Sequence, residues 1–315
     1  MIHPESKILV TGGHGFVGSH LVDRLKALGY KNIVAPTHQE CDFRNQEAVR
    51  RLFDQKKFDL IFHLAASVGG IGANQKRPAD FFTDNALMGI HLIDTAAKAN
   101  CARFVLIGTI CAYPKFAPLP FKEESLWEGY PEETNAPYGV AKRSLVVAAQ
   151  AYRQQYGFNY VALFPTNLYG PRDDFDLDNS HVIPALIRKC EEAREKDERT
   201  IHLWGTGEPS RDFLYVADAV EAMILAAKEE GIEGEILNLG SEQEIKVRDL
   251  AQLVAKVTGY SGTFMWDSKK PDGQPRRCVS NEKCRRLLKF SPRYPLEKGI
   301  EATVNWYREA FRTHR

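Results

Sequence analysis

The stretch KILVTGGHGFVGSHLVDRLKALGY, residues 7–30, decides the fold of this chain. It begins with a short β-rich run and continues into apolar residues at helical spacing over 18–30. Between the two lie Gly12, Gly15 and Gly18, which allow a tight turn and a close approach of the backbone to a ligand. Because the first N–H groups of a helix bind anions, this turn predicts a dinucleotide-binding site rather than a turn that serves packing alone.

The same alternation of strand and helix signals continues toward residue 170. The strands are rich in Val, Ile and Leu without polar alternation, which indicates a parallel sheet covered on both faces: a doubly wound α/β (Rossmann) fold. A polar, proline-bounded loop then follows, so we expect the dinucleotide-binding domain over 1–170, with later returns near 212–240, and a smaller, discontinuous substrate domain mainly over 171–315. The expected strands are 32–36, 59–66, 103–109 and 159–168, and the expected helices are EAVRRLFDQ, 81–100 and 138–157.

Composition narrows the classes of function. Lys and Arg total 42 against 41 Asp and Glu among 315 residues, which gives no reason to expect nucleic acid or an anionic membrane as a partner. The N-terminal residues do not form a signal peptide, and no apolar run is long enough to span a bilayer, so we expect a soluble, cytoplasmic protein. The six cysteines have scattered spacings without a C-x-x-C pair, which argues against a disulfide framework and against a metal site.

The residues around the expected adenosine site favour NADP over NAD. An NAD site commonly has an acidic residue after the second strand, whereas this strand ends VAPTHQE, with Thr37 and His38 at that point. His14, in the glycine turn, is a second possible partner for a phosphate; the alternative for both histidines is a solvated loop position. Asp42 with Phe43 either flanks the adenine, or Asp42 caps the helix at 45–53.

Tyr138 and Lys142, in YGVAK, stand four residues apart and therefore share one helix face. An ammonium beside a phenol lowers the phenol pKa from its ordinary value of about 10, which would make Tyr138 a proton donor to the alkoxide formed by hydride addition. Thr109, at the end of the preceding strand, can hold the same oxygen by a hydrogen bond. Together with the glycine turn, these residues predict a carbonyl reductase.

With these residues in place, the chain resembles the GDP-L-fucose synthase family of the extended short-chain dehydrogenase/reductase superfamily over nearly its whole length. The longer motifs carry the resemblance: SVGGIGANQKRPADF, CAYPK, APYGVAK, FPTNLYGPRDDF, NSHVIPAL, WGTGEPSRDFLYV and SKKPDGQPR. The family converts GDP-4-keto-6-deoxy-mannose to GDP-L-fucose by epimerising C3 and C5 and reducing C4 with NADPH. The resemblance also implies a homodimer formed through the helices at 81–100 and 138–157.

The resemblance implies that Cys111 is the base and His181 the acid of the epimerisation. From the residues alone, Cys111 would be a small buried hydrophobe and His181 a loop histidine bonded to backbone. The cations of the later loops suit the diphosphate of the substrate. Among the implied substrate residues, Trp204 is the one most open to a purely structural role. The implied cofactor residues also include Phe16, Val17, Ala65, Ala66, Pro165, Asn167, Leu168 and His181, and the implied substrate residues are Asn74, Arg188, Lys189, Trp204, Arg211 and either Lys269 or Lys270.

Two departures from the family pattern stand out. The hydroxyl residue before the cysteine is Thr109 where the family has serine, and its methyl group narrows the space near C4. His14 and His38 stand where the family has arginines that bind phosphate, which bears on the NADP preference. The alternatives left open are an epimerase or reductase of another GDP-4-keto sugar, a GDP-sugar 3,5-epimerase without net reduction, and a nucleotide-sensing regulator on the same fold.

Overall fold

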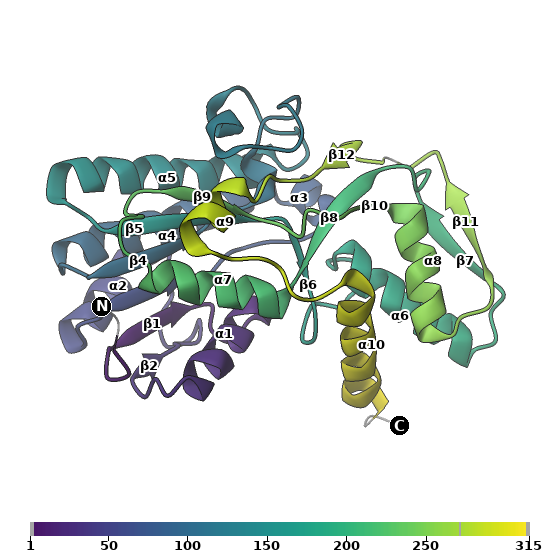
Figure 1. Cartoon of the computed structure of the whole chain (residues 1–315), viewed down its shortest axis with the longest axis horizontal. Coiled ribbons are helices and arrows are strands. Elements are labelled where there is room, and N and C mark those ends of the chain that lie inside the picture. Colours follow the sequence, from purple (N-terminus) through teal and green to yellow (C-terminus); the bar gives the residue numbers. More distant parts are fainter. Residues whose placement is uncertain (1–2, 271, 313–315) are drawn as a thin grey trace.

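A six-stranded parallel sheet forms the middle of the larger part of the molecule, at the left of Figure 1. The computed structural model describes residues 3–270 and 272–312. The strand order β2-β1-β3-β4-β5-β9 reverses direction between β1 and β3, and ligands of such sheets bind at that point, outside the carboxyl ends of the strands. The strands are β1 (Ile8–Thr11), β2 (Ile33–Val34), β3 (Leu60–His63), β4 (Arg103–Ile107), β5 (Tyr160–Pro165) and β9 (Ile236–Leu239).

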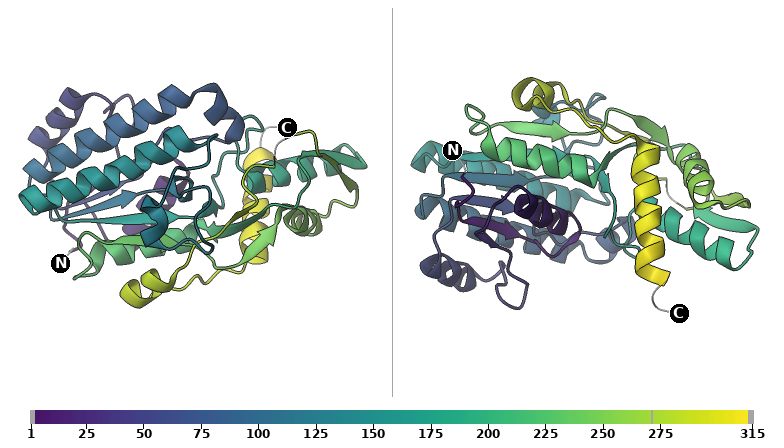
Figure 2. Two further views of the ribbon diagram at one scale, coloured as in Figure 1. Left: turned by 90° about the horizontal axis from the view of Figure 1, so that it is seen from above. Right: turned by 60° about the horizontal axis from the view of Figure 1, so that its bottom comes forward.

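Helices cover both faces of this sheet, as the apolar strands predict. On β1, Leu9 belongs to one apolar core while Ile8 and Val10 belong to the other. The helices α4 and α5 lie side by side on one face (Figure 2, left), and α1 packs against α7 on the opposite face. The doubly wound fold predicted from the sequence is thereby confirmed. The covering helices are α1 (Phe16–Ala27), α2 (Gln46–Gln55), α4 (Pro78–Lys98), α5 (Ala136–Tyr156) and α7 (Val216–Lys228).

Most predicted boundaries differ from the structure by a few residues, and for three elements the local reason is clear. Helix α4 begins at Pro78 and α5 at Ala136, each two or three residues before the predicted start, because proline is accepted in the first helical turn. The strand predicted over 159–168 is divided at Thr166, after which β6 (Asn167–Tyr169) leaves the large sheet and pairs with β8 (Ser210–Tyr215). At this division the chain leaves the large sheet and enters a second, smaller part of the molecule, which is called the smaller layer below.

The smaller layer is built around β8, which pairs with β6, β10 and β12, and around a two-stranded sheet of β7 and β11. Its helices α6, α8 and α10 enclose a third apolar core, which includes Ile187, Leu250 and Val304. Helix α9 packs on β9 instead. The chain returns to the large sheet with α7 and β9, near the predicted range 212–240. The domain boundary at residue 170 stays a prediction. The remaining elements are α3 (Ile71–Lys76), η1 (Ile110–Ala112), η2 (Glu123–Trp127), α6 (Val182–Glu195), β7 (Thr200–Trp204), β10 (Glu244–Lys246), α8 (Val247–Thr258), β11 (Thr263–Asp267), β12 (Arg276–Arg277), α9 (Glu282–Leu288) and α10 (Leu296–Arg312).

No helix in the described ranges is long and apolar enough to cross a membrane.

Candidate active site

A cavity of about 1420 Å³ lies between the large sheet and the smaller layer. Its walls come from the turn after β1, the ends of β3, β4 and β5, the start of α6, and the strands β7 and β8. Thr109, Cys111, Tyr138, Lys142 and His181 all line it. The residues predicted for hydride transfer and those implied for proton transfer therefore share one space.

The glycine turn fits a pyrophosphate. Gly12 has φ +69°, and a Cβ there would lie 2.9 Å from the backbone nitrogen of Ala65, while a Cβ on Gly18 would lie 2.1 Å from the carbonyl oxygen of Gly12. Only glycine permits this packing of the turn against β3 and α1. Helix α1 begins without a side-chain cap at Gly15, which leaves its first N–H groups available to an anion. The residues present are therefore suited to a dinucleotide.

The other residues implied for the cofactor also line the cavity, with one exception. Phe16, Val17, Phe43, Ala65, Ala66, Pro165, Asn167 and Leu168 are all part of its wall, as are His14 and His38. Asp42 is not: its carboxylate accepts hydrogen bonds from the guanidinium of Arg44, and the cap of α2 is Asn45. The alternative that Asp42 caps the helix is wrong, because Asn45 is the cap, while a contact of Asp42 with the adenine stays a prediction.

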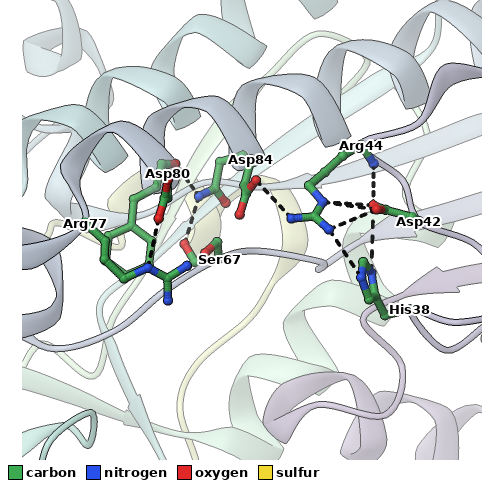
Figure 3. A network of polar contacts seen from close by, with 9 residues as sticks. His38, Asp42, Arg44, Ser67, Arg77, Asp80 and Asp84 are labelled. Atoms are coloured by element: carbon green, nitrogen blue, oxygen red, sulfur yellow. Dashed lines mark hydrogen bonds and ion pairs between the residues drawn. The ribbon is translucent and has the colours of Figure 1, made fainter.

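The two histidines of the adenosine end are held in different ways. The His14 ring nitrogen Nε2 lies 2.8 Å from the carbonyl oxygen of Ala35. Arg44 donates from Nη2 to Nε2 of His38 at 3.3 Å and also pairs with Asp84 (Figure 3). Arg44 therefore lies against His38 while its own charge is paired with Asp42 and Asp84.

Thr109, Tyr138 and Lys142 lie together at the end of β4. Tyr138 and Lys142 are buried, and Thr109 hydrogen-bonds the Tyr138 hydroxyl. Burial raises the pKa of Tyr138 above its ordinary value, and Cys111 adds to that effect, while the bond from Thr109 opposes it. The predicted lowering of this pKa by Lys142 is wrong for this geometry, because the Lys142 ammonium donates to the carbonyl oxygen of Ile107 at 3.1 Å. Tyr138 therefore keeps its proton at neutral pH, as a proton donor must.

Lys142 gives the site a pH dependence. Burial lowers the pKa of its ammonium to about 8, so the charged form is present below that pH and lost above it. We expect kcat/KM for reduction to fall as the pH rises through 8, and the Lys142→Arg variant, whose charge is permanent, to lack this decrease. Initial rates of NADPH oxidation between pH 6.5 and about 9 test this, and an identical decrease in both enzymes would assign it to another group.

The backbone of Cys111, the middle residue of η1, is held in place by two contacts. Its N–H donates to the Thr109 hydroxyl at 3.2 Å, so Thr109 contacts both Tyr138 and Cys111. A Cβ on Gly139 would lie 2.3 Å from the carbonyl oxygen of Cys111, so the absence of a side chain lets η1 approach α5 this closely. Cys111 is half-buried, whereas the other five cysteines are buried. Its thiol alone among them combines access with a place beside Tyr138.

His181 stands at the N-cap of α6. It lines the cavity, and the surrounding walls desolvate its ring and lower its pKa, with Asp174 opposing the change. The His181 side chain is exposed, and its ring makes no hydrogen bond to the other described residues, so the alternative of a loop histidine bonded to backbone does not apply. The imidazole is thus free to meet a ligand in the cavity.

Three of the cations implied for the substrate, Lys189, Arg211 and Lys270, line the cavity, and Arg188 and Lys269 do not. Residues next to each other on a helix point in directions about 100° apart, so Lys189 faces the cavity while Arg188 bonds Glu192 and the carbonyl oxygen of Phe175. The prediction for Arg188 is wrong for this reason. Of the alternatives Lys269 and Lys270, Lys270 lines the cavity, with its ammonium 5.3 Å from the centre of the Trp204 ring.

Trp204 and Asn74 line the cavity as well, together with Arg211. Trp204 is exposed rather than part of the core, so its ring is available to a planar ligand. Burial first, and Arg277 second, lower the pKa of Arg211 to about 10, which leaves it charged at neutral pH. The Asn74 amide donates to the carbonyl oxygens of Gly69 and Gly70, which leaves only its own oxygen for a substrate.

Sequence reasoning missed Arg277, Arg44 and Trp266. Arg277 and Trp266 line the cavity. Arg277 follows the basic loop SKKPDGQPR directly, so the cluster of charge was a signal, but its direction depends on the pairing of β12 with β8. Trp266 stands on β11, whose pairing with β7 no local pattern predicts. Among the residues that the structure describes, no group of His, Cys, Asp or Glu is arranged to hold a metal ion.

Comparison with known proteins agrees with this geometry. Residues 8–240 match the model of the NAD dependent epimerase/dehydratase family. The probable GDP-L-fucose synthase 1 of Oryza sativa subsp. japonica is 42% identical over 305 residues, which cover 96% of this chain and 92% of that protein. The GDP-L-fucose synthase of Escherichia coli (strain K12) is 36% identical over 97% of each chain.

Solved structures show the same architecture. The GDP-L-fucose synthetase of Naegleria fowleri bound to NADP has a TM-score of 0.90 at 28% identity and covers 99% of this chain and 97% of its own. A GDP-6-OMe-4-keto-L-xylo-heptose reductase from C. jejuni has a TM-score of 0.91 at 27% identity and covers 98% of this chain and 99% of its own. The resemblance inferred from the motifs is thus confirmed, and the chain belongs to the NAD dependent epimerase/dehydratase family, with GDP-L-fucose synthases among its full-length relatives.

Proposed function

We propose that this protein converts GDP-4-keto-6-deoxy-D-mannose to GDP-L-fucose by epimerisation at C3 and C5 and NADPH-dependent reduction at C4. One observation carries the proposal: the proton-transfer pair Cys111 and His181 lines the same cavity as Thr109, Tyr138 and Lys142. A plain reductase needs only the latter three. The relatives at 36–42% identity, all GDP-L-fucose synthases over nearly the full chain, support this choice of substrate.

Epimerisation uses the acidity of the protons next to the 4-keto group. The Cys111 thiolate takes the proton from the ring carbon, and the electron pair of that C–H bond moves to the keto oxygen as an enolate. His181 then donates a proton to the opposite face of the same carbon, which inverts it. Before the second carbon reacts, the thiol releases its proton to solvent and His181 takes one up.

Reduction follows at C4. When bound along the glycine turn, NADPH supplies the hydride. Tyr138 gives its proton to the resulting alkoxide, and the Thr109 hydroxyl holds the same oxygen. The high pKa that burial gives Tyr138 keeps the proton available, and the charged form of Lys142 places a cation in the same cavity.

The GDP part would lie against the smaller layer. Arg211, Lys189 and Lys270 line that end of the cavity and offer positive charge to a diphosphate. Trp204 offers an exposed ring for stacking with guanine. Because GDP-L-colitose synthase of Yersinia pseudotuberculosis is 32% identical over 96% of this chain, a related GDP-4-keto sugar is the second candidate substrate.

The direct test supplies the purified protein with GDP-4-keto-6-deoxy-D-mannose and NADPH and identifies the product by chromatography and NMR. We expect GDP-L-fucose and consumption of NADPH. Formation of a C4-reduced sugar with unchanged C3 and C5 would contradict the proposal, as would no reaction of this substrate beside a reaction of another GDP-4-keto sugar.

We also propose a homodimer formed through α4 and α5. Exposed apolar side chains gather on these two helices, which a monomer would leave in water: Phe82, Leu87 and Ile90 on α4, and Val147 and Tyr156 on α5. We expect the double variant Ile90→Glu/Val147→Glu to sediment at half the mass of the unaltered protein, and Leu225→Glu on α7, of similar exposure, to leave the mass unchanged. A monomeric unaltered protein in analytical ultracentrifugation would contradict the dimer. The cytoplasmic location stays a prediction.

A further inference from the structure

Arg277 is a buried cation that faces the cavity without a carboxylate partner among the described residues. Its side chain is nearly inaccessible, at 8% exposure. Nε donates to Oε1 of Gln274 at 2.7 Å, and Nη1 donates to Sγ of Cys111 at 3.4 Å. Keeping a positive charge out of water is costly unless an anion faces it, so the buried Arg277 guanidinium is expected to face an anion in the cavity.

The position of Arg277 relative to Cys111 is fixed at both ends. Its backbone pairs with Arg211 in the parallel register of β12 and β8. The Gln274 amide that holds its Nε donates in turn to the carbonyl oxygen of Lys115 at 2.9 Å, four residues after Cys111. The guanidinium is thereby tied to the same segment that carries the thiol.

The Arg277 guanidinium contacts this thiol, and Arg211, its register partner on β8, is close enough for an electrostatic effect. The pKa of Arg211 is lowered by burial and by Arg277, and Cys111 opposes the change. Glu244 and Asp272 act on Arg211 in the same direction as Cys111, whereas Arg277 donates directly to the Cys111 sulfur. Hydrogen bonds to a charged acceptor favour the charged form, and the thiolate rather than the thiol takes a proton from carbon.

We infer that Arg277 is the residue that positions Cys111 and holds it as a thiolate toward the sugar ring. The purpose of this positioning rests on the proposed function, whereas the contacts between Arg277 and Cys111 do not. When the thiolate takes the ring proton it becomes a neutral thiol, and the charge moves to the keto oxygen as an enolate. Arg277 therefore acts through Cys111 before proton transfer, whereas a role in anchoring the diphosphate would act on substrate affinity.

The test measures how fast iodoacetamide alkylates Cys111 in the NADP-loaded protein, by mass spectrometry of its peptide, as a function of pH. We compare Arg277→Met with Arg276→Met, because Arg276 is the adjacent residue of the same strand, is exposed and pairs with Glu244. We expect Arg277→Met to slow alkylation at neutral pH by about tenfold, the lower end of the effect of an opposite charge within about 4–6 Å. Its half-maximal rate should move to higher pH, and Arg276→Met should behave like the unaltered protein.

Arg277→Lys keeps the charge and is expected to recover part of the rate, which covers the case in which the methionine variant fails to fold. Deuterium incorporation at C3 and C5 should fall through kcat while KM for the GDP-sugar changes little. An unchanged alkylation profile with a raised KM would overturn the inference and assign Arg277 to the diphosphate. If the alkylation profile shifts but the unaltered protein incorporates no deuterium, the proposed function fails and the inference stands.

Discussion

Replacing Cys111 with serine is expected to lower deuterium incorporation at C3 and C5 by about 10²–10⁴-fold, the contribution typical of a positioned general base. A serine hydroxyl fits the space of the thiol but does not ionise at neutral pH, so the base is lost while the packing of η1 is kept. The half-buried Cys111 has no role in the wall of the glycine turn. NADPH binding, measured by fluorescence titration, is therefore expected to stay unchanged.

Cys41→Ser is the matched control, because Cys41 lines the adenosine end of the same cavity. It is expected to leave deuterium incorporation unaffected. Combined loss of NADPH binding and of thermal stability in Cys111→Ser would show that Cys111 serves the structure, and normal deuterium incorporation in that variant would show that another group is the base.

Replacing Tyr138 with phenylalanine is expected to lower the rate of NADPH oxidation by about 10²–10⁴-fold, because the alkoxide at C4 then lacks its proton donor. Tyr138 is buried, and phenylalanine keeps its ring volume, so little change in folding is expected. Deuterium incorporation at C3 and C5 is expected to continue, since Cys111 and His181 remain in place. The Tyr138→Phe variant would thus separate reduction at C4 from epimerisation at C3 and C5 in one protein.

Tyr130→Phe, on an exposed tyrosine, is the control for the loss of a phenol hydroxyl. If Tyr138→Phe ends both NADPH oxidation and deuterium incorporation, Tyr138 serves proton transfer at the ring carbons as well. Undiminished reduction would mean that another group protonates C4.

The sequence predicted the parts of the site that depend on local pattern. The glycine turn, the end of β4 and the first turn of α5 each occupy a short stretch, and neighbouring parallel strands bring their carboxyl ends to one edge of the sheet. Gly12, Thr109 and Tyr138 therefore meet at the cavity as the fold requires. The implied pair Cys111 and His181 lines the same space, although their stretches are far apart in the chain.

What the sequence could not predict depends on the direction of single side chains. The choice between Arg188 and Lys189 is set by the rotation of α6, and the pairing of Asp42 with Arg44 is invisible in the sequence. Arg277 reaches Cys111 only through the pairing of β12 with β8. The pKa of Tyr138 was predicted from one neighbour, whereas burial decides it.

The most direct test of the account follows NADPH oxidation and deuterium incorporation together in deuterated water with GDP-4-keto-6-deoxy-D-mannose. Each molecule of product is expected to consume one NADPH and to carry deuterium at both C3 and C5. Deuterium without NADPH oxidation would reveal an epimerase alone, and NADPH oxidation without deuterium would reveal a plain C4 reductase; either result would contradict the account.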